Sequence, residues 1–202
     1  GEACDDGNTD IWDGCNTSCE PTEFLVNTHT EAKQSFPVVA IDGYGNSIIA
    51  FNSYNHPEDD DVDGVFLKRF FSDGESGFEQ HVNTYIQHGQ ERPDIAADAS
   101  GRFIVTWQGQ SDVVEDGVDI FAQRFDSDGS PIGDEFKVNT TDSGTQFQSS
   151  VSMDEDGNFV VAWRGYDSGP STAYAQRFYS NGSKNGVEFI VNSTFIFHIE
   201  EI

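Results

Sequence analysis

Apolar and aromatic residues alternate with polar ones in short runs along most of this chain. Two runs are nearly identical in character, Phe103–Trp107 and Phe159–Trp163, and Ile48–Phe51 is their counterpart earlier in the sequence. β-Branched and aromatic residues with this alternation are typical of half-buried strands. Another short apolar run precedes each of them, at Val38–Ile41, Ile95–Ala97 and Val151–Met153. The pattern therefore predicts pairs of adjacent β-strands.

A turn signal joins the two strands of each pair. An aspartate opens the turn and a glycine closes it, at Asp42–Gly45, Asp98–Gly101 and Asp154–Gly157, which suits a tight hairpin. A third strand is predicted at Val65–Phe71, Ile120–Phe125 and Ala173–Phe178, and a fourth in the segments of the form Glu-Phe-x-Val-Asn. No stretch has helical periodicity. We therefore expect an all-β fold of four-stranded antiparallel units.

The units recur at a step of 56 residues. Val-Asn pairs mark this step at residues 26–27, 82–83 and 138–139, and a fourth pair follows 53 residues later at 191–192. Other residues that keep the period, or nearly so, are Gln34, Gln90, Gln146, Phe51, Trp107, Trp163, Arg69, Arg124 and Arg177. A fixed period of this length indicates a repeat architecture in which each unit buries its apolar face against its neighbours.

Four-stranded units of about 50 residues resemble the blades of β-propellers. The recurring Val-Asn-Thr, Gln, Asp, Gly, Trp and Gln-Arg-Phe positions also look like a class of secreted bacterial repeats. We expect Trp107 and Trp163 to pack between units, and the recurring arginines to satisfy carbonyls or carboxylates there. Three units are fewer than the usual number of about 4–8 blades. Either further repeats lie outside this chain, or the three close with β-trefoil-like threefold symmetry.

Composition narrows the function classes. The 202 residues carry 36 acidic and 10 basic side chains, for a formal net charge of −26, which argues against nucleic acid and anionic membrane surfaces as partners. No apolar run approaches the roughly 18 residues of a transmembrane span. The five histidines (29, 56, 81, 88 and 198) form no recognisable catalytic motif with a nucleophile. We therefore do not expect an enzyme.

The first 22 residues form a distinct segment rich in cysteine. Cys4-Asp-Asp-Gly-Asn8, followed by Asp13-Gly-Cys15 and Cys19, resembles the Myxococcus-type cysteine-rich repeat (the DUF4215 module). Trp12 stands where that family has glycine, and the segment that would carry a fourth cysteine before Gly1 is absent. The resemblance implies disulfides among Cys4, Cys15, Cys19 and a partner outside the sequence, on a preceding part of a longer polypeptide or on a neighbouring subunit.

Hard oxygen donors crowd the same segment. They are Asp5, Asp6, Asn8, Asp10 and Asp13, and calcium favours such a set because it takes about 6–8 oxygens in forgiving geometry. Asp and Asn are also ordinary turn residues, so a disulfide-bonded loop without metal is the alternative. Four Asn-x-Ser/Thr sequons, at Asn16, Asn139, Asn181 and Asn192, can carry glycans if a glycosylating cell secretes the chain.

The sequence thus predicts three parts: a calcium-binding type of module at 1–22, three β-repeats at 23–192, and a strand-like tail at 193–202 that can pair with a neighbouring subunit. With no initial methionine or signal-like segment, we expect a mature or excised piece of a longer product. The leading hypothesis is an extracellular structural protein, a homopolymer of a surface fibre joined head to tail. The alternative is a secreted glycan-binding adhesin or lectin-like module.

Overall fold

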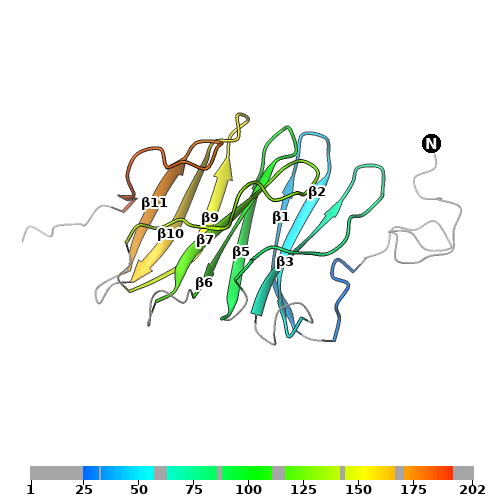
Figure 1. Cartoon of the computed structure of the whole chain (residues 1–202), viewed down its shortest axis with the longest axis horizontal. Helices are drawn as coiled ribbons and strands as arrows, with labels where there is room; N and C mark the ends of the chain where they lie inside the picture. The colour runs from blue at the N-terminus through cyan, green and yellow to red at the C-terminus, as the bar shows by residue number, and fades with distance from the viewer. Residues whose placement is uncertain are drawn as a thin grey trace, which may run out of the picture.

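The computed structural model describes residues 25–31, 33–56, 63–85, 88–110, 117–141, 144–166 and 171–192. Twelve β-strands and no helix occur within these ranges (Figure 1). The strands are β1 (Gln34–Ile41), β2 (Ser47–Tyr54), β3 (Asp63–Phe70), β4 (Gln80–His81), β5 (Gln90–Ala97), β6 (Phe103–Gly109), β7 (Asp119–Phe125), β8 (Phe136–Lys137), β9 (Thr145–Met153), β10 (Phe159–Tyr166), β11 (Thr172–Phe178) and β12 (Phe189–Ile190). Because no helix is present in the described ranges, none of them contains a helical membrane span.

The strands form three four-stranded antiparallel sheets. Sheet 1 has the order β1-β2-β3-β4, sheet 2 the order β5-β6-β7-β8, and sheet 3 the order β9-β10-β11-β12. The expectation of an all-β fold with four antiparallel strands per unit is confirmed. Figure 1 shows the sheets following one another in a row, with β5 packed beside both β1 and β9. This row differs from the threefold closure of the trefoil-like alternative.

The first strand of each sheet contains a β-bulge. Its register shifts between Ser35 and Val38 in sheet 1, and at the matching position in the other two sheets. One residue of each bulge has a left-handed backbone, with φ of 53° at Phe36, 57° at Arg92 and 55° at Gln148. A bulge leaves one residue out of the ladder and turns the strand. The strand is therefore longer than the apolar run that predicts it.

The predicted hairpin turns are present and are closed by their aspartates. Asp98 accepts hydrogen bonds from the backbone nitrogens of Ser100 (2.8 Å) and Arg102 (3.1 Å), and Gly101 takes a φ of +87° that suits glycine. Burial raises the pKa of Asp98, but the hydrogen bonds and charge of Ser100 and Arg102 outweigh it and leave that pKa below its ordinary value. The carboxylate therefore stays ionised while buried.

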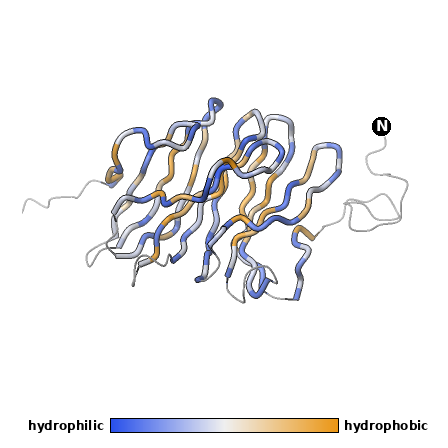
Figure 2. The backbone as a smooth tube through the Cα atoms, in the orientation of Figure 1, coloured by the Kyte–Doolittle hydropathy of each residue, from blue (hydrophilic) through white to orange (hydrophobic). Residues whose placement is uncertain are grey.

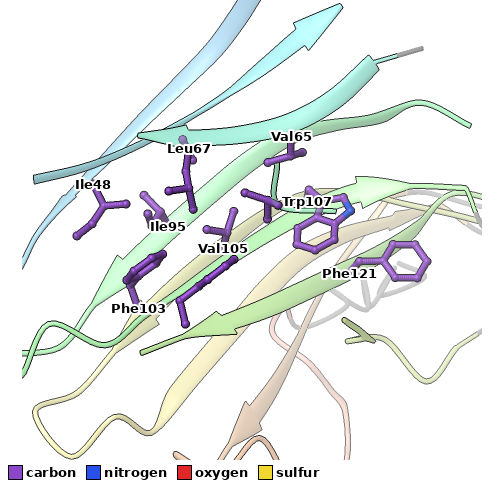
Figure 3. Close-up of a cluster of buried hydrophobic side chains, with 11 residues drawn as sticks. Ile48, Val65, Leu67, Ile95, Phe103, Val105, Trp107 and Phe121 are labelled. Atoms are coloured by element: carbon purple, nitrogen blue, oxygen red, sulfur yellow. The ribbon is translucent and has the colours of Figure 1, made fainter. Parts of the chain in front are cut away.

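Two apolar cores lie between the sheets. The first joins residues of sheets 1 and 2, with Trp107 at 0% exposure in one cluster with Val65 and Leu67 (Figure 3). The second joins sheets 2 and 3 and includes Trp163 at 3% exposure. Figure 2 shows hydrophobic positions interleaved with polar ones along the strands, as the alternation predicts. The expectation that both tryptophans are core residues between units is confirmed.

The Val-Asn pairs at 82–83, 138–139 and 191–192 each follow the fourth strand of a sheet, which is only two residues long. The backbone nitrogen of Val82 donates to the carbonyl of Val65 (2.9 Å), and the Val65 nitrogen donates to the side-chain oxygen of Asn83 (2.7 Å). The asparagine amide thus takes the place of a backbone partner. Asn139 does the same for Ile120 (2.9 Å), which explains why the pair recurs.

Candidate interaction surfaces

The recurring arginines connect one sheet to the next. Arg69 on β3 donates to the carbonyl of Ser127 in sheet 2, and Arg124 on β7 donates to the carbonyl of Ser180 in sheet 3 (2.9 Å). Burial lowers the pKa of Arg124, although an arginine stays charged well above neutral pH. The expectation that these arginines satisfy carbonyls between units is confirmed for the two that face another sheet.

Glycines make room for these arginines. A Cβ on Gly129 would lie 3.4 Å from Arg69 Nη1, and one on Gly182 would lie 2.8 Å from Arg124 Nε. Both glycines have a positive φ, of 90° and 86° respectively. The turn after the third strand of one sheet is therefore shaped to receive the arginine of the sheet before it.

A second contact joins the hairpin turns of neighbouring sheets. A Cβ on Gly101 would lie 3.2 Å from the Oδ2 atom of Asp42, and one on Gly157 would lie 3.2 Å from the Oδ2 atom of Asp98. Both aspartates are buried, with exposures of 6% and 3%. Each turn therefore rests against the turn aspartate of the preceding sheet.

A third contact uses the bulges. The backbone nitrogen of Arg92 donates to Asn52 Oδ1 on β2 (2.7 Å), and that of Gln148 donates to Gln108 Oε1 on β6 (3.0 Å). The bulge turns its amide out of its own sheet, so the preceding sheet can accept it. This use of the bulge has no clear signal in the sequence.

A fourth contact pairs the residue after each Val-Asn with a glutamate of the following sheet. The backbone nitrogen of Thr84 lies 2.7 Å from Glu135 Oε2, and that of Thr140 lies 2.6 Å from Glu188 Oε2. Thr28 makes the same bond to Glu79, at 2.6 Å. Glu135 and Glu188 open the Glu-Phe-x-Val-Asn segments and Glu79 takes the matching position, but the sequence alone indicated no role for them.

The outer face of sheet 1, turned away from sheet 2, is largely apolar and uncovered. Val39 is 60% exposed and Ile41 is 68% exposed, whereas Ile95, which matches Val39 in sheet 2, is 6% exposed. Gly74, which matches Gly129, has no atom within 4 Å of the position that a Cβ would take. The face thus resembles one side of an internal sheet contact, with no other described sheet packed on it.

The outer face of sheet 3, turned away from sheet 2, is also exposed, and it corresponds to the other side of the internal sheet contact. Val160 is 36% exposed, whereas its counterparts Ile48 and Ile104 are both 0% exposed. Arg177, the third recurring arginine, is exposed and lies over the ring of Phe189, 5.1 Å from its centroid. This face carries the same residue types that sheets 1 and 2 present to the sheet that follows them.

A shallow cavity of about 380 Å³ marks this outer face, lined by Asp154, Asn158, Arg177 and their neighbours. The equivalent cavity between sheets 2 and 3 measures about 330 Å³ and has part of its lining supplied by Gly157, Ser180 and Asn181 of sheet 3. Hydrogen bonding from the Asn158 side chain holds the pKa of Asp154 below its ordinary value, so this face keeps one anionic and one cationic group.

Three histidines that are apart in the sequence meet beside sheet 1. The rings of His29 and His56 are 5.1 Å apart, His56 Nε2 lies 3.3 Å from Glu79 Oε1, and His81 stacks on Phe66 at 4.6 Å. Sequence reasoning missed this group because loops bring its members together. Within the described ranges, no group of His, Cys, Asp and Glu is arranged to hold a metal ion.

The predicted metal and disulfide residues lie outside the described part of the chain. They are Asp5, Asp6, Asn8, Asp10, Asp13, Cys4, Cys15 and Cys19, and the sequon at Asn16 lies with them.

The other three sequons are in described segments and differ in exposure. Asn139 is 2% exposed and its Nδ2 donates to Asp119 (2.7 Å) and to the Thr141 carbonyl (2.8 Å). Asn181 and Asn192 are both exposed.

Comparison with known proteins identifies a fold likeness only. No protein-family model matches the chain, and no curated protein matches it either. Among solved structures, it is similar to a Hadza microbial sialidase, with 15% identity and a TM-score of 0.60 over 81% of this chain. It is also similar to an endo-arabinase from Bacteroides thetaiotaomicron, with 14% identity and a TM-score of 0.54 over 82% of this chain. The match spans only 38% of the sialidase chain and 63% of the endo-arabinase chain.

Proposed function

We propose that the chain is an extracellular structural protein, a repeat unit of a surface fibre whose copies join head to tail. One observation carries the proposal. The residues that recur with the period, such as Arg69 and Arg124, make contacts between sheets, and the outer faces present the same residue types exposed. In this proposal the sheets are consecutive propeller-type blades, and the chain has no catalytic activity of its own.

The segment 1–22 has its own part in the proposal. Calcium held by Asp5, Asp6, Asn8, Asp10 and Asp13 would stabilise a module that a neighbouring subunit completes, with disulfides from Cys4, Cys15 and Cys19. Exposed sequons would carry glycans at the fibre surface. Support comes from the donor chemistry of the segment, since calcium prefers carboxylate and amide oxygens.

Imaging and mass measurement of native material test the proposal. Particle imaging and non-reducing intact mass would be recorded with and without a calcium chelator and a reductant. We expect ordered polymers that shorten on chelation or reduction. A uniform monomer at every protein concentration, indifferent to both treatments, would refute the structural role.

A second candidate function is glycan binding, and the fold likeness to a sialidase and an endo-arabinase favours it. A lectin-like module would be monomeric and would bind a sugar saturably. A glycan array followed by titration calorimetry on the monomeric fraction tests this alternative. Saturable binding by a chain that never polymerises would favour the lectin-like function over the fibre.

A further inference from the structure

We propose that the outer face of sheet 1 of one copy docks on the outer face of sheet 3 of a second copy, continuing the row of sheets across the joint. This inference rests on the proposed function and names the partner and the register. It follows from the two internal contacts, between sheets 1 and 2 and between sheets 2 and 3, which use matching residues. Each outer face is one half of that same contact.

The arginine contact fixes the register. Arg69 reaches Ser127 and Gly129 of the next sheet, and Arg124 reaches the matching residues Ser180 and Gly182. In the next repeat, the arginine at the matching position is Arg177, which is exposed and would be the donor at the joint.

The matching acceptor is in sheet 1. It is the carbonyl of Ser72, beside Gly74, which has a φ of +95° and open space around it. In the joint, Arg177 of one copy donates to the Ser72 carbonyl of the other.

The turn contact gives the same register independently. Asp42 rests against Gly101, and Asp98 rests against Gly157. The next aspartate is Asp154, which is exposed. Its partner would be Gly45 of the second copy; among the described residues, a Cβ built on Gly45 would meet only Ser72 of the same sheet, at 3.6 Å.

Apolar surface between these polar contacts would be buried. Val39 and Ile41 of one copy would cover Val160 of the other and the valine of the Val-Asn position beside it. Val191, which holds that position in the single copy, is 57% exposed, whereas its counterpart Val82 is 3% exposed. A face of this kind, apolar at its centre and polar at its rim, is typical of protein interfaces.

Two Val-Asn pairs would meet at the joint, Val26-Asn27 of one copy and Val191-Asn192 of the other. Only one of them can occupy the position after the fourth strand of sheet 3. Asn27 donates to the carbonyl of His29 (2.7 Å), as Asn83 donates to that of Tyr85 (2.8 Å), so its side chain already has the conformation of a fourth strand. In sheet 3, Asn192 accepts from the Ala173 nitrogen (2.9 Å).

The incoming Asn27 precedes β1 as Asn83 precedes β5. We infer that Asn27 of the second copy replaces Asn192, so the joint forms by strand exchange.

One internal contact has no counterpart at the joint. Asn52 and Gln108 accept a bulge amide from the next sheet, but Arg164 occupies the matching position in sheet 3. A guanidinium has no acceptor atom. The joint therefore lacks one bond of the internal contact, and we expect it to open before the sheets of one copy separate.

Two variants of the full chain, each blocked at one face, test the joint. Arg177→Glu blocks the outer face of sheet 3, and Ile41→Asp blocks that of sheet 1. Both side chains are exposed in the single copy, so the fold should be retained, as circular dichroism would check. Lys184→Glu is the control for Arg177→Glu, because it makes the same change of charge. Phe78→Asp is the control for Ile41→Asp, because it also replaces an apolar side chain by aspartate. Phe78 stays 97% exposed even with sheet 1 packed on sheet 2.

Mass photometry in the presence of chelator and reductant gives the outcome. We expect the wild type and both controls to associate, and each blocked variant alone to associate roughly 30-fold more weakly, because Arg177→Glu removes a charged donor and Ile41→Asp buries an unpaired charge. A mixture of the two blocked variants should form dimers that grow no further, because each retains one intact face.

The opposite outcomes separate the two proposals. If the wild type associates and the blocked variants associate equally well, or if their mixture forms no dimer, the joint is refuted while the fibre proposal stands through residues 1–22. If association of the wild type is lost on chelation or reduction, the joint is likewise refuted. If the wild type never associates under any condition, the fibre proposal itself fails.

Discussion

Replacing Trp107 by phenylalanine tests how much the recurring Trp–Gln pair, which joins β5 and β6 of one sheet, stabilises the fold. Trp107 is 0% exposed, and its Nε1 donates to Gln90 Oε1 at 3.0 Å. The same oxygen lies over Gly109, 1.6 Å from where a Cβ would be, so a different donor has little space to approach. Loss of the indole would leave this buried acceptor without its donor, at a cost of about 1–3 kcal/mol.

The smaller ring adds a packing cost. Full truncation of a buried tryptophan costs about 3–5 kcal/mol, and a phenyl ring retains most of that contact. We take about 1 kcal/mol for packing, so W107F should lower the free energy of unfolding by about 2–4 kcal/mol. Urea unfolding followed by circular dichroism measures this, as a midpoint lower by about 1 M or more.

Two further variants control the interpretation. Trp163 makes the equivalent bond to Gln146 at 3.1 Å, so W163F should cost a similar amount. Tyr166 is 52% exposed on the same strand, and Tyr166→Phe should leave the midpoint unchanged. If the free energy of unfolding of W107F lies within about 0.5 kcal/mol of the wild-type value, the Trp–Gln pair does not stabilise the fold and its recurrence needs another cause.

Three other predictions follow from the same contacts. Material secreted by a glycosylating cell should carry a glycan at exposed Asn181 but not at buried Asn139, and glycopeptide mass spectrometry would show the reverse if the sequons act independently of the fold. Gly109→Ala should destabilise the fold by about 3 kcal/mol or more, because its Cβ would overlap the side-chain oxygen of the buried glutamine on β5, whereas Gly89→Ala meets only an ordinary contact at 3.8 Å; equal thermal midpoints for the two would contradict this. The folded-state pKa of Asp98 lies below its ordinary value, so the stability that ionised Asp98 contributes is complete above about pH 4. It is lost as the pH falls through the lower folded-state pKa. Asp98→Asn should therefore reduce the fall of the melting temperature at acid pH, and an unchanged fall would show that Asp98 is not its cause.

Sequence periodicity predicted the second and third strands well because their apolar runs are rich in β-branched and aromatic residues. β6 begins at Phe103 and β10 at Phe159, as the apolar runs indicate. The first strands were predicted too short. The bulge of β5 includes Arg92 and Pro93, and β1 has proline at the matching position, which the apolar pattern does not count as strand. A bulge is identified by the backbone φ of one residue and by the hydrogen-bond acceptor that its amide finds on another sheet. A single run of residues in the sequence reveals neither.

The contacts between sheets were only partly predictable, for a related reason. The arginines stood out because this chain has few basic residues. Glu135 and Asn52 did not stand out, since carboxylates and amides are common along the chain. A recurring residue can be found from the period alone, but its partner is known only when the neighbouring sheet is in place.

The acidity of the chain favours one register of association over the others. With a net charge of −26, two copies repel each other in most orientations, and the repulsion weakens with salt. The outer face of sheet 3 is an exception because Arg177 is exposed there. Inside the molecule, Arg69 lies near Asp128, whose pKa is lowered by its bonds with Ser130 and, more weakly, by that arginine. Asp73 is the matching aspartate of sheet 1, so the proposed register places Arg177 beside it. Opposite charges then meet in this register, and the same acidity that keeps single copies apart would favour the head-to-tail joint.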